Sequence, residues 1–502
     1  MGLSQNSVDD LIPWFVCFAI LSAILVFGLL SSRSINRGGD DFLTGGRGFG
    51  PIIVMLSIFS TSNTGFMFVG AIGAGYAQGL SALWLALAWC IGETAFWMVF
   101  PPKINDYALR KSPVSVPDYI AKAAPDRQML VRLAAGLVVA ATTLPFIVAQ
   151  NVAAGKAIAS VADLSLSMSV FVAGGALTGI ALVYCVWGGL KASMMANALQ
   201  GASILLIGAV LFIIVLLQLL ATGAPVDRLL MNNPDVFDPF ATTPLALMLF
   251  FLLGGATASF GGAASLPTVL MRVSVADSPK TLQNIKWVYI GTCYLFLGAM
   301  MLMGVMLSGL VSDAPDPEQS LFVFSQSLSP WVLGLALGGA MVLILSTLDG
   351  SILVGGAALS DDVWGDRASN RSLVRLRRGL GILIFSSLAL ALGVLLANRS
   401  VFQIILFGLS AMAGGIGPVF IIATLGLKTN HQALIATMIV GVITAVAWSA
   451  FGLSEYVGEA FPSFVAGLMA HQLVAKLGKS KTVSSLHASG TMPGSSRPSG
   501  SS

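Results

Sequence analysis

Long apolar runs separated by short polar segments make up most of this chain. A membrane-spanning helix needs about 20 apolar residues, so the runs predict membrane spans. The first run follows Asp9 and Asp10 without a basic segment or a small-residue cleavage site, so we expect a retained helix and not a signal peptide. We predict thirteen spans, at approximately 11–31, 50–76, 80–101, 129–156, 168–188, 192–221, 244–268, 284–310, 330–360, 378–397, 401–425, 431–453 and 459–477.

Composition supports an integral membrane protein. Hydrophobic residues make up 56% of the chain and charged residues only 10%, whereas soluble domains carry about 25% charged residues. The four Cys and three His residues are scattered, so we expect neither a disulfide framework nor a metal cluster. The net charge of +4 comes from basic residues in particular loops, so it does not indicate nucleic-acid binding.

The basic residues predict the orientation. If the N-terminus lies outside, only Lys156, Arg228 and Arg399 of the 26 Lys and Arg residues fall outside the inner loops. Arg272 is then an inner-loop residue, and the outer loops are acidic, as in "SDAPDPEQ". Cytoplasmic loops carry such an excess of positive charge. We therefore expect a multi-pass protein of the inner (cell) membrane, with its N-terminus outside and its C-terminus cytoplasmic.

Two spans are rich in small and polar residues. They contain "SIFSTSNTGFMFVGAIGAG" (Ser57–Gly75) and "GGATASFGGAASLPT" (Gly254–Thr268). Small residues also serve close packing of membrane helices. However, the two spans are five segments apart and therefore run in opposite directions across the bilayer. This spacing favours a five-plus-five inverted repeat with two broken helices at the midplane.

A further span carries an acid. "LILSTLDGS" (Leu343–Ser351) places Asp349 just after Ser346 and Thr347. A carboxylate at membrane depth costs about 2.5–3.5 kcal/mol on insertion scales and usually marks an ion or proton path.

These motifs together resemble those of the sodium:solute symporter family, and most closely its sodium/proline symporters. The resemblance runs from about residue 10 to 477. The segments that carry it are "DDFLTGGRGFGPIIVMLSIFSTSNTG" (Asp40–Gly65), "VWGGLKASMMANALQG" (Val186–Gly201), "LPTVLMR" (Leu266–Arg272), "LILSTLDGSILVGGAALSDDVW" (Leu343–Trp364) and "GGIGPVF" (Gly414–Phe420).

The resemblance implies an all-α LeuT-type fold with one extra helix before the ten-helix core and two after it. We expect the N-terminal helix and basic loop at 1–49, the two five-helix repeats at 50–221 and 222–425, and two C-terminal helices at 426–483. The Ser/Gly-rich tail at 484–502 is expected to be disordered.

The resemblance also implies a sodium site, with no organic cofactor. Its ligands would be the backbone carbonyls of Ser60, Asn63 and Leu343 and the hydroxyls of Ser346 and Thr347. Sodium is a hard cation, and carbonyl and hydroxyl oxygens suit such ions.

The chain departs from the family pattern at three positions. Many members carry aspartates where Ser62 and Asn197 stand here, and a serine where Asp349 stands. Asp349 shares a helix face with Ser346, so our hypothesis is that Asp349 restores one lost charge to the cation region, facing Asn197. Two alternatives remain: Asp349 is wetted and structural near the cytoplasmic end of its span, or it titrates and the carrier uses protons.

The solute is expected beside the two breaks, where half-helix ends can hold a carboxylate. No arginine, lysine or obvious acid lines this inferred pocket, which favours a small zwitterionic or neutral solute. For Glu93 we expect a structural partnership or exposure to a water-filled cavity ahead of solute contact. The candidate contacts are Thr64, Gly65, Phe66, Gln150, Ser259 and Phe260.

We therefore predict a secondary active transporter, in which sodium entry drives a small solute inward, with proline as the first candidate and another amino acid or a compatible solute next. The alternatives are a proton-coupled symporter of the same fold and a transporter-like membrane sensor. Ser346, Thr347 and Asp349 argue against a passive channel, which would need no coupled cation site. An enzyme is not expected, because we find no nucleophile–base set and no phosphate loop.

Overall fold

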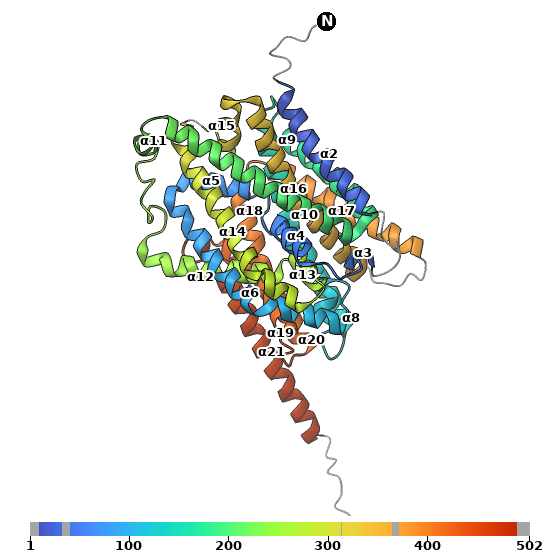
Figure 1. The fold of residues 1–502 in the computed structure, drawn as a ribbon. Coiled ribbons are helices and arrows are strands. Elements are labelled where there is room, and N and C mark those ends of the chain that lie inside the picture. The colour runs from blue at the N-terminus through green and yellow to red at the C-terminus, as the bar shows by residue number, and fades with distance from the viewer. Residues whose placement is uncertain (1–9, 33–40, 313, 364–370, 489–502) are drawn as a thin grey trace, which may run out of the picture.

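A computed structural model of the protein shows a bundle of helices (Figure 1). The structure describes residues 10–32, 41–312, 314–363 and 371–488. Apart from an isolated parallel bridge between Phe49 and Ala276, these residues form helices, turns and loops. The predicted all-α class is confirmed.

The N-terminal half contains two features that shape the bundle: a broken span and a kinked double span. Its helices are α2 (Ile12–Ser32), α3 (Asp41–Thr44), α4 (Pro51–Ser62), η1 (Met67–Ala71), α5 (Ile72–Gln78), η2 (Gly79–Ala82), α6 (Leu83–Lys111), α7 (Val116–Ala121), α8 (Gln128–Ala159), α9 (Leu166–Ser169), η3 (Val170–Gly174) and α10 (Gly175–Ala221).

The kink in α10 separates the predicted spans 168–188 and 192–221. Gly189 there has φ 53° and ψ −150°, outside the helical region. A Cβ at this position would lie 2.3 Å from the carbonyl oxygen of Phe42. Only glycine combines this backbone conformation with so close an approach.

The break in the first Gly/Ser-rich span separates α4 from η1 and α5. Asn63 ends α4 with φ −90° and ψ 84°, and the chain then passes through Thr64 and Gly65 before the helix resumes. A Cβ on Gly65 would lie 2.5 Å from Ile344 Cγ1 and 2.7 Å from Gln150 Oε1. The structure thus contains the predicted interruption, packed tightly against α16 (Pro330–Ala357) and α8.

The C-terminal half contains the second interruption and the most buried helix, α16. Its remaining helices are α11 (Pro225–Asn232), α12 (Leu245–Ser265), α13 (Pro267–Ser274), α14 (Pro279–Ser308), η4 (Pro317–Gln319), α15 (Ser320–Leu328), η5 (Ala358–Val363), α17 (Arg371–Leu395), α18 (Val401–Gly415), α19 (Gly417–Thr424), α20 (His431–Ala450), η6 (Leu453–Glu455) and α21 (Ala460–Ala488).

The second interruption lies at the far end of the predicted stretch. α12 is helical through Gly254 to Ser265, and the chain leaves the helix only at Leu266, with φ −59° and ψ 103°. Pro267 explains this position, because a proline disfavours helical geometry in the residue before it. The small residues of this span therefore lie within the helix, and the break follows them.

The described residues contain nine helices that are long and apolar enough to cross a membrane, or ten if α18 and α19 form one span bent by 42°. Each of the thirteen predicted ranges contains helix. The structure thus supports a multi-span membrane protein, while the count of thirteen stays a prediction.

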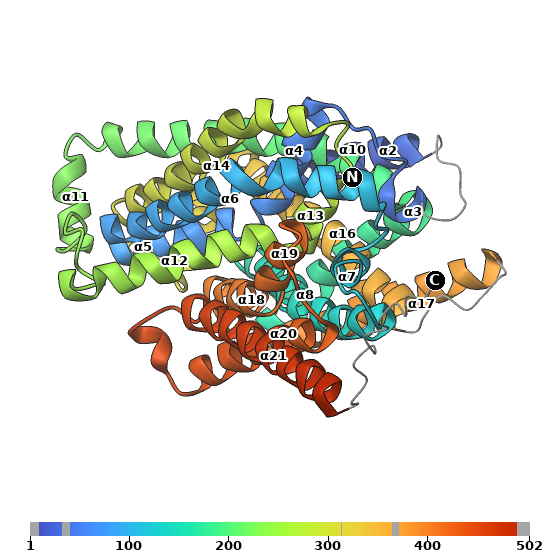
Figure 2. The same ribbon diagram turned by 90° about the horizontal axis from the view of Figure 1, so that it is seen from below.

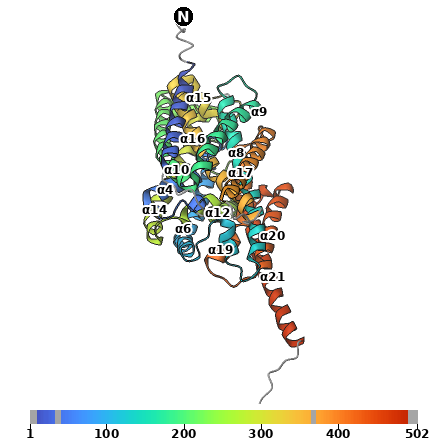
Figure 3. The same cartoon turned by 90° about the vertical axis from the view of Figure 1, so that its right-hand side faces the viewer.

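α16 lies at the centre of the bundle. In the apolar 18-residue stretch of the span that contains α16, 83% of the residues are buried, whereas the same fraction is 33–61% in the other candidate spans. α4 and α10 pack on one side of α16 and α8 packs on the other, and α8 also contacts α18 and α20 (Figure 2). The start of α2 and the end of α21 lie at opposite ends of the bundle (Figure 3), as an odd number of spans requires.

Two expectations need correction. Arg272, expected in an inner loop, lies in α13 and its side chain is fully buried, because the segment after the break folds back into the bundle as a helix. In addition, the first residues of the predicted tail, 484–488, belong to α21. The rest of that tail lies outside the described residues.

Ion pairs link α8 to other segments near its two ends. Lys156 Nζ in α8 lies 2.6 Å from Asp316 Oδ2 and 2.6 Å from Glu318 Oε2, both in the acidic loop predicted to be outside. Glu318 also accepts hydrogen bonds from the backbone N–H groups of Val401 and Phe402 at the start of α18. Toward the other end of α8, Arg132 Nε lies 2.5 Å from Asp362 Oδ1.

Candidate functional site: a cation region and a solute pocket at one helix break

Hydroxyl groups of α16 meet carbonyl groups beside the break that follows α4. Ser346 Oγ lies 2.9 Å from the carbonyl oxygen of Ser60 and 2.7 Å from that of Leu343. Thr347 Oγ1 lies 3.4 Å from the Leu343 carbonyl oxygen. Ser60 stands in the last turn of α4, where the helix end leaves carbonyl groups without intrahelical partners. The structure therefore brings together four of the predicted sodium ligands.

Asn63, the fifth predicted ligand, holds the end of α4. Its side-chain Nδ2 donates to the Phe59 carbonyl oxygen at 2.8 Å and to Cys293 Sγ at 3.5 Å. Its backbone conformation, and not its side chain, opens the helix here. Within the described residues no three or more His, Cys, Asp and Glu side chains group as metal ligands. Carbonyl and hydroxyl oxygens, the groups present at this break, are of the kind that hard cations prefer.

Asp349 and Asn197 face each other across α16 and α10. Asn197 Nδ2 donates to Asp349 Oδ1 at 3.2 Å and to Thr61 Oγ1 at 3.1 Å. Both Asp349 and Asn197 are fully buried, so the alternative of a wetted Asp349 does not agree with the structure. Asn197 Oδ1 is buried and has no hydrogen-bond partner, which leaves an oxygen for a ligand in this region.

Arg272, which the sequence placed in an inner loop, also lies in this region. Its Nε donates to Ser57 Oγ at 2.8 Å, its Nη1 to the Thr268 carbonyl oxygen at 2.8 Å and its Nη2 to Ser193 Oγ at 3.0 Å. Ser193 Oγ also accepts from Asn197 Nδ2 at 3.4 Å. Arg272 and Asp349 therefore belong to one buried polar network, in which a positive and a negative charge compensate each other.

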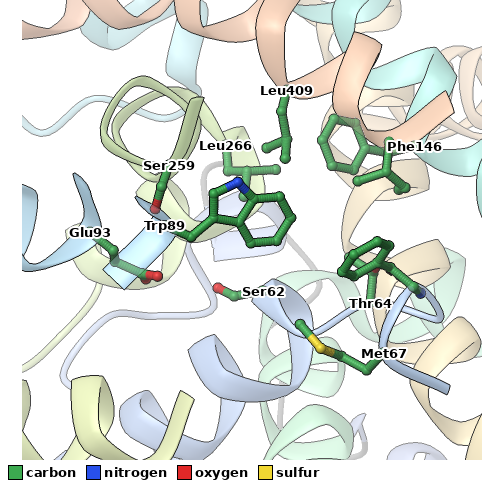
Figure 4. A pocket seen from close by; sticks show the side chains of 11 residues that line it. Ser62, Thr64, Met67, Trp89, Glu93, Phe146, Ser259, Leu266 and Leu409 are labelled. Atoms are coloured by element: carbon green, nitrogen blue, oxygen red, sulfur yellow. Dashed lines mark hydrogen bonds between the residues drawn. The ribbon is translucent and has the colours of Figure 1, made fainter. Parts of the chain in front are cut away.

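A cavity opens on the other side of the same break (Figure 4). Its volume is about 60 Å³, smaller than the range of about 300–1,000 Å³ that is usual for small-molecule sites. Most of its wall is apolar or aromatic. The lining residues are Ser62, Thr64, Phe66, Met67, Trp89, Glu93, Phe146, Ser259, Leu266, Ile405 and Leu409.

Three of the predicted solute contacts line this cavity, namely Thr64, Phe66 and Ser259. Gln150 lies behind the break, where its Oε1 accepts from the backbone N–H of Gly65 at 2.8 Å. Phe260 is turned away from the cavity and packs edge-on against Phe100, at a centroid distance of 5.8 Å. Ser259 lines the cavity and Phe260 does not, because α12 is a continuous helix there and adjacent residues of a helix point in different directions.

Glu93 lines the cavity, contrary to the expectation that no acid would do so. Its Oε1 accepts from Tyr289 Oη at 2.7 Å, and its Oε2 lies 2.9 Å from Tyr294 Oη. Tyr289 Oη is also 3.2 Å from Ser62 Oγ. The structural partnership expected for Glu93 is therefore present, and the side chain also faces the cavity.

The break borders two groups of polar atoms. On one side its carbonyl oxygens meet the hydroxyls of α16, and on the other side Ser62 and Thr64 line the cavity. In transporters with broken helices, ion and substrate sites lie together at such interruptions.

Sequence comparison identifies the family. Residues 42–441 match the Sodium:solute symporter family. The chain belongs to the sodium:solute symporter family. Membership confirms the function class predicted from the motifs, sodium-coupled symport of a small solute, and it supports the expectation of a transporter and not an enzyme.

Among its relatives, the osmoregulated proline transporter OpuE of Bacillus subtilis (strain 168) is 24% identical, over 97% of this chain and 98% of the relative. The sodium/proline symporter of Escherichia coli (strain K12) is 23% identical, over 93% of each chain. A solved structure of a Na+-coupled sialic acid symporter in a substrate-bound outward-open state has a TM-score of 0.68 at 16% identity, covering 92% of this chain and 98% of that one. This likeness confirms the predicted LeuT-type fold.

Proposed function

We propose that this protein couples sodium entry to the inward transport of proline, or of another amino acid or compatible solute, across the inner membrane. The observation that carries the proposal is the position of the Ser346 and Thr347 hydroxyls on the Ser60 and Leu343 carbonyls, with a cavity at the same break. The names of the relatives, which are proline transporters, favour proline.

We further propose that Asp349 contributes negative charge to the cation region. Its contact with Asn197, and the unpaired Asn197 Oδ1, support a cation that binds between α10 and α16. The nearby Arg272 supports the competing role, in which Asp349 only balances a buried positive charge. Replacing Asp349 with Asn separates these roles, because a ligand role predicts a higher sodium concentration for half-maximal transport, and a purely structural role predicts lower stability with unchanged sodium dependence.

The proposed topology has the N-terminus outside, the C-terminus in the cytoplasm and repeats at 50–221 and 222–425. The ion pair of Lys156 with Glu318 then closes the outer side, and that of Arg132 with Asp362 the inner side. Proton coupling remains the alternative through Asp349, which is the buried acid beside the cation region.

The test is uptake of radiolabelled proline, and of a panel of amino acids and compatible solutes, into proteoliposomes. An inward sodium gradient is compared with an equal potassium gradient and with a pH gradient. Uptake that requires sodium supports the proposal. Uptake that follows the pH gradient and ignores sodium contradicts it in favour of proton coupling, and binding without uptake favours a sensor.

A further inference from the structure

Glu93 is an acid with a defined place in the cavity wall that the proposed sodium coupling does not use. It lies on α6, one helical turn after Trp89, and both side chains line the cavity. Figure 4 shows the Glu93 carboxylate and the hydroxyl groups of Ser62 and Ser259 turned toward the same part of the cavity. These three side chains come from α6, α4 and α12, so the fold brings the oxygens together from three different helices.

The neighbouring hydroxyl groups are arranged to stabilise an ionised carboxylate. The Tyr289 phenol has one proton and lies closer to Glu93 Oε1, at 2.7 Å, than to Ser62 Oγ, at 3.2 Å. Tyr289 therefore donates to Glu93, and its oxygen also lies within hydrogen-bond distance of Ser62 Oγ. Tyr294 Oη lies 2.9 Å from Glu93 Oε2 and shares its proton with the Trp89 carbonyl oxygen, also at 2.9 Å. Both carboxyl oxygens of Glu93 therefore lie within hydrogen-bond distance of a phenol, and an ionised carboxylate can accept from both.

Within the part of the chain that the structure describes, no Lys, Arg or His forms an ion pair with Glu93. The cavity lining contains no basic side chain either. A carboxylate without a cationic partner at membrane depth is costly. A positively charged group that enters the cavity from outside would therefore find its most favourable position at Glu93.

The rest of the wall favours an organic cation over a metal ion. The ring centroids of Phe66 and Trp89 lie 5.5 Å apart, and both rings line the same cavity as Glu93. Aromatic faces, Trp above all, attract ammonium groups, while Phe146 and Leu409 offer apolar contact to a carbon ring.

We propose that Glu93 is the counter-ion for the protonated amine of the transported solute, so that the cavity selects solutes with an ammonium group. The amine would lie between Glu93 and the aromatic rings, and its carbon skeleton against the apolar wall. This proposal rests on the proposed transport function and deepens it, since it names the solute class: amino acids and related ammonium compounds, not sugars, polyols or simple carboxylates.

The experiment uses Glu93→Gln, which keeps the size and removes the charge, in proteoliposomes with radiolabelled L-proline. Two competitors are compared: unlabelled L-proline and cyclopentanecarboxylate, which has a carbon in place of the proline nitrogen. Asp106→Asn, an exposed acid on the same helix paired with Arg110, is the matched control. Sodium dependence is measured at saturating proline for each protein.

We expect wild type and Asp106→Asn to prefer proline over cyclopentanecarboxylate, and Glu93→Gln to raise the KM for proline at least about tenfold. The variant should bind cyclopentanecarboxylate as wild type does and keep its sodium dependence. An unchanged KM for proline overturns the proposal. The proposal is also overturned if Glu93→Gln binds proline and cyclopentanecarboxylate more weakly by the same factor, which indicates a structural role for Glu93. A change in sodium dependence alone overturns it too, because Glu93 is then an ion ligand.

The wild-type protein also tests the proposal if Glu93→Gln does not fold. Equal inhibition by proline and cyclopentanecarboxylate overturns it, as does sodium-driven uptake of neutral polyols but of no amine. In both cases sodium symport itself still stands. If the wild-type protein shows no sodium-dependent uptake of any solute, the proposed transport function itself is contradicted. Failure of the Glu93 proposal and failure of the proposed function therefore give different results. Glu93→Asp, which keeps the charge but shortens the side chain, should recover part of the preference for proline.

Discussion

Replacing Ser346 with Ala should weaken sodium binding with little effect on the rest of the fold. Ser346 Oγ is fully buried between the Ser60 and Leu343 carbonyl oxygens, at 2.9 and 2.7 Å. The substitution removes one ligand oxygen and leaves both carbonyl groups in place. A hydrogen bond or similar polar contact to a charged group contributes about 1.5–3 kcal/mol, which corresponds to an increase of roughly 10- to 150-fold in the sodium concentration for half-maximal transport.

The assay is proline uptake as a function of sodium at fixed membrane potential, in proteoliposomes that contain equal amounts of each protein. Ser351→Ala is the control, because Ser351 is a buried serine on the same helix that takes no part in the Ser346 contacts. Its sodium dependence should match that of wild type. If Ser346→Ala has the wild-type sodium dependence, the ion does not bind at this break and the proposed site is wrong.

Two further substitutions test the break and the outer ion pair. Gly65→Ala should abolish transport and cost about 1–3 kcal/mol of stability by overpacking, because its Cβ would lie 2.5 Å from Ile344 Cγ1; wild-type uptake would contradict the tight packing. Lys156→Met should lower the midpoint temperature of unfolding, since removing one partner of a buried ion pair costs up to about 3–5 kcal/mol. The loss of stability should be smaller than this, because backbone N–H groups of α18 still donate to Glu318 in the variant. The exposed Lys103→Met is the control for thermal unfolding, and an equal midpoint for both variants would contradict this account.

Local sequence was sufficient for the features that depend on local chemistry. The dense Gly, Ser, Thr and Asn residues before Gly65 predicted a break, and Asn63 does leave the helix there. The spacing of Ser346 and Asp349 placed both on one face of α16, and the resemblance to the family put Asn197 opposite. The structure has that contact at 3.2 Å.

The features that were missed depend on tertiary packing. Glu93 looked like an isolated acid in an apolar run, and only the rotation of α6 against α14 brings it to Tyr289 and into the cavity wall. Arg272 was counted with the inner loops because a basic residue after an apolar span usually lies there. Its burial depends on hydroxyl groups from two other helices, which the motif "LPTVLMR" does not reveal.

Sodium flux driven by the solute would test the central claim most directly. Proteoliposomes with equal sodium on both sides receive an inward proline gradient, and the entry of radiolabelled sodium is followed in wild type and in Ser346→Ala. The account predicts that proline drives sodium into wild-type vesicles and that the variant needs much more sodium to give the same flux. Proline entry without any movement of sodium in the wild type would contradict it.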